Sequence, residues 1–169
     1  MAENTETTKR PLAVGCAVIT VSESRDQSRD QSGKIIREML EARGHQVVHY
    51  TVIKGVPLQI KGELAMQVQR PSCKAIILNG GTGLAPRNQT YDTVAPLLDK
   101  RFEAFGELYR YLAYQEIGSG AMLLRAVAGT YKSRVLFCLP GAPPAVRLAM
   151  EKLIGPELGN MVSQLQRFG

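Results

Sequence analysis

The chain contains no tryptophan, and aromatic residues make up only 6% of its 169 residues. Proteins that bind single-stranded nucleic acid stack bases on aromatic side chains, and this chain offers few such platforms. Its 21 lysines and arginines give a net charge of +6, but they are dispersed, with no basic run longer than Lys-Arg. Because the positive charge is dispersed and aromatic residues are few, a small anionic ligand suits this chain better than nucleic acid, and we expect no nucleic-acid partner.

Long hydrophobic runs are also absent. No apolar stretch approaches the roughly 20 residues that a membrane-spanning helix needs, and the first ten residues are polar, without the apolar core of a signal peptide. We therefore expect a cytoplasmic protein with no membrane partner. Hydrophobic residues still make up 44% of the chain, enough for a sizeable core. We predict a disordered N-terminal tail over residues 1–11 and a single domain over residues 12–169.

Cysteine and histidine are scarce, which argues against disulfides and metal centres. Cys16, Cys73 and Cys138 are odd in number, far apart and surrounded by apolar residues, so we predict three reduced thiols in the core. His45 and His49 stand four residues apart in an expected strand, where both would face the same side. Because no third ligand candidate is close in sequence, no metal site is assured.

Apolar, β-branched segments alternate with segments of helical periodicity. The strands are expected over residues 12–21, 45–52, 74–79 and 134–139, and the first, third and fourth are apolar enough to be buried on both faces. Helices are expected before Gly44, after Pro57, over about 91–98 with Thr90 as N-cap, around 105–112, over 121–128 and after Pro144. This alternation predicts an α/β fold with a doubly wound, mainly parallel sheet and helices on both faces.

Three unusual loops follow the expected strands, over residues 22–33, 79–90 and 140–144. Ligands of open α/β sheets bind outside the carboxyl ends of the strands, so we expect these loops to form one cleft. The second loop begins Gly80-Gly81-Thr82-Gly83, where the backbone can approach a ligand closely and amide groups can converge on an anion. The alternative is an ordinary turn-rich loop. Neither a dinucleotide fingerprint nor a complete P-loop motif is present.

Charged side chains near these loops are candidates for ligand contacts. Arg87 and Arg125 could each hold a phosphate through two parallel hydrogen bonds, or could be solvated surface residues. Glu107 and Arg110 lie three residues apart on one face of an expected helix, an arrangement that also fits a simple surface pair.

In combination, these segments resemble the molybdopterin-binding family of MoaB and MogA, which also includes the G domain of gephyrin. The matching segments run in the family's order along the chain: TVSESR (20–25), DQSG (30–33), NGGTGLAPRNQT (79–90), FGELYR (105–110), EIGSGAMLLRAVAG (116–129) and LPGAP (139–143). The resemblance covers the chain from about Leu12 onward.

The resemblance implies a small appended subdomain, a homo-oligomer that is a trimer or a hexamer, and a role in molybdenum cofactor biosynthesis. Active members bind molybdopterin, an anionic pterin dithiolene with a terminal phosphate, and adenylylate it with Mg-ATP. The expected ligand-binding residues are Ser22, Glu23, Ser32, Gly33, Gly80, Gly81, Thr82, Gly83, Arg87, Thr90, Glu107, Arg110, Arg125, Pro140 and Gly141. Asn88 and Glu107 are the candidates for a catalytic role.

The chain departs from the adenylylating members at acidic positions. Asn88 stands where they carry Asp, and Lys54 lies in a loop where they carry an acid. Glu23, Leu124 and Ala142 replace the usual Asp, Ser and Ser. Since Mg²⁺ prefers carboxylate ligands, these changes leave catalysis open. The chain is either a molybdopterin adenylyltransferase or a non-catalytic protein that binds or delivers molybdopterin, and a third possibility is an interaction scaffold like the gephyrin domain.

Overall fold

The computed structural model describes residues 12–167, so the tail predicted over residues 1–11 lies outside the described residues. Six strands form one sheet in the order β2-β1-β3-β6-β5-β4. Their bounds are β1 Gly15–Val21, β2 Gln46–Ile53, β3 Ala75–Asn79, β4 Lys100–Arg101, β5 Val127–Tyr131 and β6 Arg134–Leu139. β2, β1, β3 and β6 run parallel, whereas β5 and β4 are antiparallel to their neighbours. The predicted mainly parallel sheet is confirmed.

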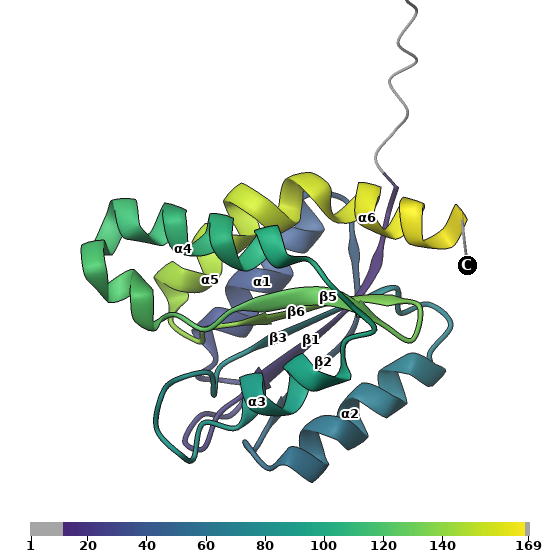
Figure 1. Ribbon diagram of the computed structural model, residues 1–169. Helices are drawn as coiled ribbons and strands as arrows, with labels where there is room; N and C mark the ends of the chain where they lie inside the picture. The colour runs from purple at the N-terminus through teal and green to yellow at the C-terminus, as the bar shows by residue number, and fades with distance from the viewer. Residues whose placement is uncertain (1–11, 168–169) are drawn as a thin grey trace, which may run out of the picture.

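Helices cover both faces of this sheet (Figure 1). One layer contains α1 (Gln31–Ala42), α4 (Glu103–Ile117), α5 (Pro143–Ala149) and α6 (Gly155–Arg167), with the π-helical turn η3 (Met150–Ile154) joining the last two. The other layer contains α2 (Pro57–Gln69) and α3 (Thr90–Val94), which continues into the 3-10 turn η1 (Ala95–Leu97). A second 3-10 turn, η2 (Gly118–Leu123), follows α4. The end of α4 and η2 project beyond the sheet in Figure 1, as a small appended unit.

The strand alternation divides the core between the two layers. Cys16 and Val18 of β1 pack toward α1, while Ala17 and Ile19 pack toward α2. Because successive side chains point to opposite faces, an apolar strand of this kind supplies both cores at once. The three cysteines are fully buried and free, as predicted. Burial disfavours the thiolate and raises the pKa of Cys138 to about 12.

The helix predicted over residues 121–128 is wrong. The first residues of this segment belong to η2, which ends at Leu123, and its last residues belong to β5, where Val127 pairs with Cys138. β5 and β6 form a hairpin whose two turn residues, Lys132 and Ser133, both have positive φ, 43° and 62°. Such turns usually carry Asn or Gly, so Lys-Ser gave no hairpin signal in the sequence. The two-residue strand β4 was not predicted either.

The other helix boundaries agree closely with the predicted ones. Gly44 ends α1 with φ of 81°, and Pro57 opens α2, both as predicted. Thr90 is the first residue of α3, and its N-cap is Gln89. His45 and His49 have separate partners: His45 Nδ1 accepts from Val14 N–H at 3.1 Å, and His49 Nε2 lies 2.6 Å from the Glu63 carboxylate. Among residues 12–167, no helix is long and apolar enough to cross a membrane.

Candidate functional site

A cleft of about 430 Å³ lies at the carboxyl ends of β1, β3 and β6. β1 and β3 are the pair at which the chain order of the sheet reverses, so this is the edge where open α/β sheets bind ligands. The three loops expected to form one cleft all contribute to its lining, together with the end of β1 and the segment from the end of η2 toward β5. The lining residues are Thr20, Val21, Ser22, Ser24, Arg25, Asn79, Gly80, Gly81, Thr82, Gly83, Asn88, Leu123, Leu124, Arg125, Pro140, Gly141 and Ala142.

The glycine loop leaves β3 in a conformation that favours glycine. Gly80 and Gly81 have φ of 93° and 67°, and a side chain on Gly80 would collide with the Val21 carbonyl oxygen. The loop is held at both ends, since Gly80 N–H donates to Leu139 and Thr90 N–H donates to the Gly81 carbonyl, each at 3.0 Å. Gly80, Gly81 and Gly83 line the cleft through their backbone alone, and this part of the lining is called the glycine floor.

The start of α1 supports the cleft from behind. Asp30 caps the helix by accepting from Gly33 N–H at 2.9 Å, and it also accepts from the Tyr50 hydroxyl at 2.7 Å. Burial, followed by this hydrogen bond, raises the pKa of Tyr50. The Ser32 hydroxyl donates to the Gly141 carbonyl at 2.6 Å. Ser32 therefore positions the Pro140-Gly141 turn, and Gly33 belongs to the helix cap; neither is among the lining residues.

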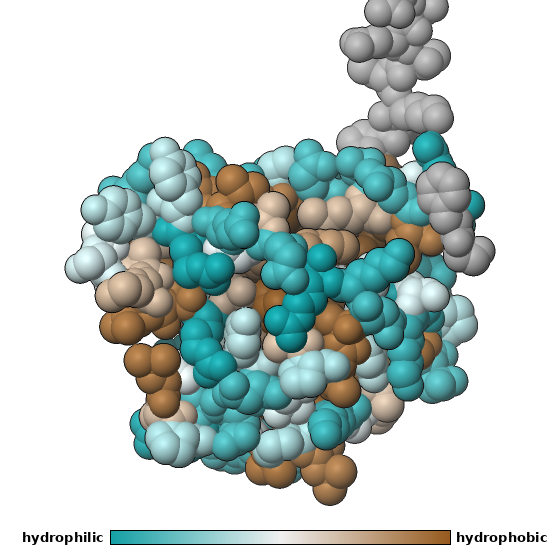
Figure 2. Space-filling view, in the orientation of Figure 1, coloured by the Kyte–Doolittle hydropathy of each residue, from teal (hydrophilic) through white to brown (hydrophobic). Residues whose placement is uncertain are grey.

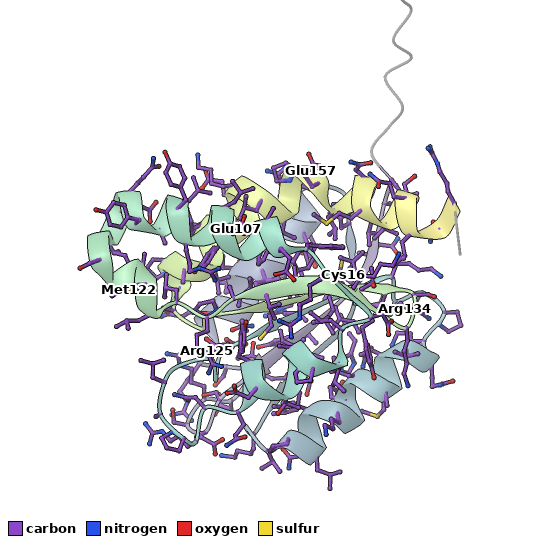
Figure 3. The ribbon with its side chains drawn as sticks, viewed as in Figure 1. Cys16, Glu107, Met122, Arg125, Arg134 and Glu157 are labelled. Atoms are coloured by element: carbon purple, nitrogen blue, oxygen red, sulfur yellow. The ribbon has the colours of Figure 1, made fainter. Side chains whose placement is uncertain are left out.

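Arg125 reaches the cleft as one half of an ion pair. Its two terminal nitrogens donate to the Asp92 carboxylate at 3.0 and 2.6 Å, and its guanidinium lies 4.3 Å from the centre of the Tyr91 ring. The hydrogen bond from Arg125 lowers the pKa of Asp92. Figure 3 shows Arg125 near α3, whereas Glu107 lies in the other helical layer on α4. The pair fixes the orientation of a cation at the edge of the cleft.

Several predicted ligand residues lie outside the described lining. Arg87 is exposed, Glu107 is exposed on α4, and Arg110 borders a separate hollow with Tyr111 and Met122. The Glu23 carboxylate accepts from Gly55 N–H at 2.8 Å, and its carbonyl accepts from Lys54. A ligand role for these four charged residues, and a catalytic role for Glu107, stay predictions.

Sequence reasoning overlooked Thr20, Ser24, Arg25 and Asn79, which also line the cleft. Arg25 lies in a loop where basic and acidic residues alternate. The sequence therefore does not indicate which of these charged side chains remains unpaired. Asn79 is fully buried, and its side-chain nitrogen donates to Thr20 at 2.9 Å while its Oδ1 has no partner. An unpaired buried acceptor suits a ligand that carries N–H groups.

The chemistry of the lining favours an anion. Hydroxyls, amides, backbone N–H groups and two arginines line the cleft, and no aspartate or glutamate among the described residues does so. Asn88 is in the lining as an amide. Within residues 12–167, no three His, Cys, Asp or Glu side chains are grouped to hold a metal ion. The described residues therefore do not fit a carboxylate-bound Mg²⁺.

Comparison with known proteins identifies the family. A family model described as a probable molybdopterin binding domain matches residues 17–160. The chain is 44% identical over 156 residues to the molybdenum cofactor biosynthesis protein B of Halalkalibacterium halodurans, covering 92% of each chain. The chain belongs to the MoaB-like molybdopterin-binding family. The resemblance found in the loop motifs is thereby confirmed.

Solved structures of the MoaB-like family share the fold. A crystal structure of molybdenum cofactor biosynthesis protein B superposes with a TM-score of 0.91 at 41% identity, covering 94% of this chain and 99% of that one. The tungsten cofactor synthesizing protein MoaB from Pyrococcus furiosus superposes with a TM-score of 0.83 at 30% identity, covering 92% and 98%. This member thus has nearly the full length of its MoaB-like relatives and the same sheet.

Proposed function

We propose that the cleft at the carboxyl ends of β1, β3 and β6 binds molybdopterin, and that the chain acts in the cytoplasm in molybdenum cofactor biosynthesis. The observation that carries the proposal is the lining: a glycine floor, hydroxyls and two arginines, without an acidic side chain among the described residues. A terminal phosphate suits such a surface, since backbone amides and guanidinium groups are the usual partners of phosphate.

Between the two roles left open by the sequence, the geometry favours binding or delivery over adenylylation. Nucleotidyl transfer from Mg-ATP needs carboxylates that hold the metal ion. The cleft offers the Asn88 amide instead, and Lys54 lies in contact with the Glu23 carbonyl. When bound, Mg-ATP would supply the adenylyl group, but this chain presents no carboxylate in the described lining to hold its metal ion.

One experiment separates these roles. The purified protein is incubated with molybdopterin, and binding is measured by isothermal titration calorimetry; Mg-ATP is then added and adenylylated molybdopterin is sought by mass spectrometry. We expect binding without product. Product formed at a rate proportional to protein concentration would instead establish an adenylyltransferase, and absence of binding would contradict the proposed function itself.

We further propose that the chain assembles as a trimer or hexamer. Large apolar side chains are exposed on α4 and η2, and Figure 2 shows hydrophobic side chains gathered at the left of the view, where these elements meet. The exposed residues are Leu108, Tyr111, Tyr114, Ile117, Met122 and Leu123. Contiguous patches of this kind mark protein interfaces. Light scattering should give a mass three or six times that of the chain, and a monomer would contradict the assembly.

A further inference from the structure

Two arginines line the cleft, and they differ in how their guanidinium groups are used. Arg125 directs both terminal nitrogens to Asp92. Arg25, which is exposed, makes no side-chain hydrogen bond or ion pair with any residue in the 12–167 range. Arg25 is therefore the lining cation with its full set of donors available to a ligand.

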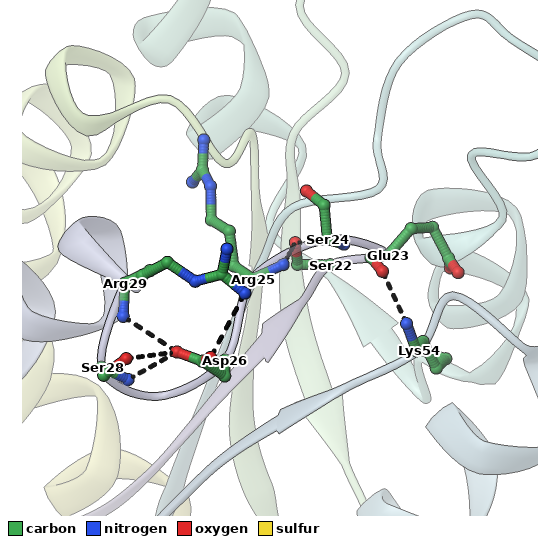
Figure 4. A network of polar contacts seen from close by, with 8 residues as sticks. All are labelled: Ser22, Glu23, Ser24, Arg25, Asp26, Ser28, Arg29 and Lys54. Atoms are coloured by element: carbon green, nitrogen blue, oxygen red, sulfur yellow. Dashed lines mark hydrogen bonds and ion pairs between the residues drawn. The ribbon is translucent and has the colours of Figure 1, made fainter.

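The loop holds the base of Arg25 in place. Its backbone N–H donates to the Ser22 hydroxyl oxygen at 3.1 Å, and Ser24 N–H lies 3.4 Å from the same oxygen. Ser22 thus accepts from the backbone and keeps its own O–H proton to donate. Figure 4 shows the Arg25 side chain extending away from Asp26, without a dashed line at its guanidinium.

The neighbouring acids Glu23 and Asp26 each have another hydrogen-bond partner, and neither forms an ion pair with Arg25 among the described residues. Asp26 accepts from the Ser28 hydroxyl at 2.5 Å and from the Arg29 guanidinium at 3.2 Å. Glu23 accepts from Gly55 N–H at 2.8 Å. One arginine of the loop is consequently paired and the other free, although they lie only four residues apart.

We propose that Arg25 binds the phosphate monoester of the ligand at the mouth of the cleft, with the Ser22 hydroxyl as a second donor. This inference rests on the proposed function and specifies which group of the ligand lies where. The planar guanidinium presents two parallel N–H groups to two phosphate oxygens, a geometry that a lysine cannot reproduce. Arg125, oriented by Asp92, also lines the cleft, but its terminal nitrogens already donate to that carboxylate.

The test compares two arginines of the same loop against two forms of one ligand. Arg25→Ala, Arg25→Lys and the matched control Arg29→Ala are each titrated with molybdopterin and with the same pterin after phosphatase treatment. We expect Arg25→Ala to bind the phosphorylated pterin about tenfold or more weakly. Its affinity for the dephosphorylated pterin should be unchanged, so its preference for phosphate should disappear.

The controls distinguish direct contact from loop disorder. Arg29→Ala should keep the phosphate preference, and Arg25→Lys should keep part of it. A phosphate preference retained in Arg25→Ala, or lost equally in Arg29→Ala, would overturn the inference while leaving the proposed function intact. Wild-type protein that binds neither pterin would contradict the proposed function before any variant is compared, and the assignment of Arg25 would fall with it.

Discussion

The cleft and a second, larger hollow lie at different ends of the sheet and differ in chemistry. The hollow, here called the helical groove, measures about 720 Å³, against about 430 Å³ for the cleft. Its lining lies between α4 and α6 and includes Val135 near the start of β6, whereas the cleft lies where β6 ends. Phe102, Phe105, Leu108, Leu153, Met161 and Leu165 make the groove apolar.

This difference in chemistry favours the cleft as the ligand site, although the groove has the larger volume. The groove is lined mainly by apolar side chains, and its charged lining residues include the carboxylates Asp99 and Glu157, which repel an anion. The smaller cleft has a glycine floor and a free arginine, which the groove lacks in its described lining. We therefore assign anion binding to the cleft and expect changes in the groove to affect stability instead.

The largest effect is expected at the cleft floor. Gly81→Val places a branched side chain at positive φ, where it would collide with the Thr90 hydroxyl. We expect binding of molybdopterin to fall below detection in calorimetry, and the free energy of unfolding to fall by about 1–3 kcal/mol. The control is Gly62→Val on α2, where an added Cβ has open space. Unchanged affinity in Gly81→Val would mean that the loop is only a turn.

A substitution in the core beside the groove should lower the stability of the fold and leave the affinity for the pterin unchanged. Phe105 is 6% exposed and packs against Phe137 at a centroid distance of 5.4 Å. Phe105→Ala should lower the free energy of unfolding by about 3–5 kcal/mol in chemical denaturation, with affinity for the pterin unchanged in the folded protein. Lys152→Ala, at an exposed residue that also lines the groove, serves as the control and should change stability by about 0.5 kcal/mol or less. A selective loss of affinity in Phe105→Ala would place ligand binding in the groove.

A single negative charge sharpens the comparison further. Asn88→Asp introduces a carboxylate into the cleft, and without Mg²⁺ we expect affinity for molybdopterin to fall by about three- to tenfold through repulsion of the phosphate. The matched control is Gln164→Glu, which adds the same charge beside the groove. Combining Asn88→Asp with Lys54→Asp under saturating Mg-ATP then tests whether carboxylates restore adenylylation. Equal affinities in Asn88→Asp and Gln164→Glu would contradict an anion site at the cleft.

The smallest effect concerns the Asp92–Arg125 pair. Because Arg125 lowers the pKa of Asp92, the pair stabilises the fold at neutral pH and loses this effect as pH falls through the lowered value. In Arg125→Ala the pKa of Asp92 should rise toward the ordinary carboxyl value, as followed by NMR titration. Asp26 is the internal control, since hydrogen bonds from Ser28 and Arg29 lower its pKa to about 2 independently of Arg125. An Asp92 midpoint unaffected by Arg125→Ala would show that the pair does not form in solution.

Sequence reasoning predicted the regions governed by local patterns. The strand over residues 134–139 was predicted to the residue, because an apolar run bounded by Pro140 leaves little choice. Sequence reasoning also predicted that the loops over residues 22–33, 79–90 and 140–144 lie at one edge of the sheet, because the carboxyl ends of parallel strands meet at the same edge. The hairpin of β5 was missed because its Lys132-Ser133 turn lacks the usual residues, and long-range pairing with β6 overrode the helical pattern.

The pairing of charged side chains could not be predicted from the sequence. Arg25 and Arg29 carry the same charge in the same loop, and only the folded backbone decides that Asp26 pairs with Arg29. Likewise, the sequence spacing does not indicate that Asp92 forms an ion pair with Arg125, which lies 33 residues further along the chain. Loop sequence therefore predicts where a site lies better than it predicts which charges remain free.

The most direct test of the central claim is to map molybdopterin binding onto the backbone by amide NMR. The account predicts that added molybdopterin shifts the amide signals of Gly80, Gly81, Gly83 and Gly141, while signals from α6 around Met161 and Leu165 stay in place. Shifts concentrated in α4 and α6, with the glycine loop unaffected, would contradict it and assign the ligand to the helical groove.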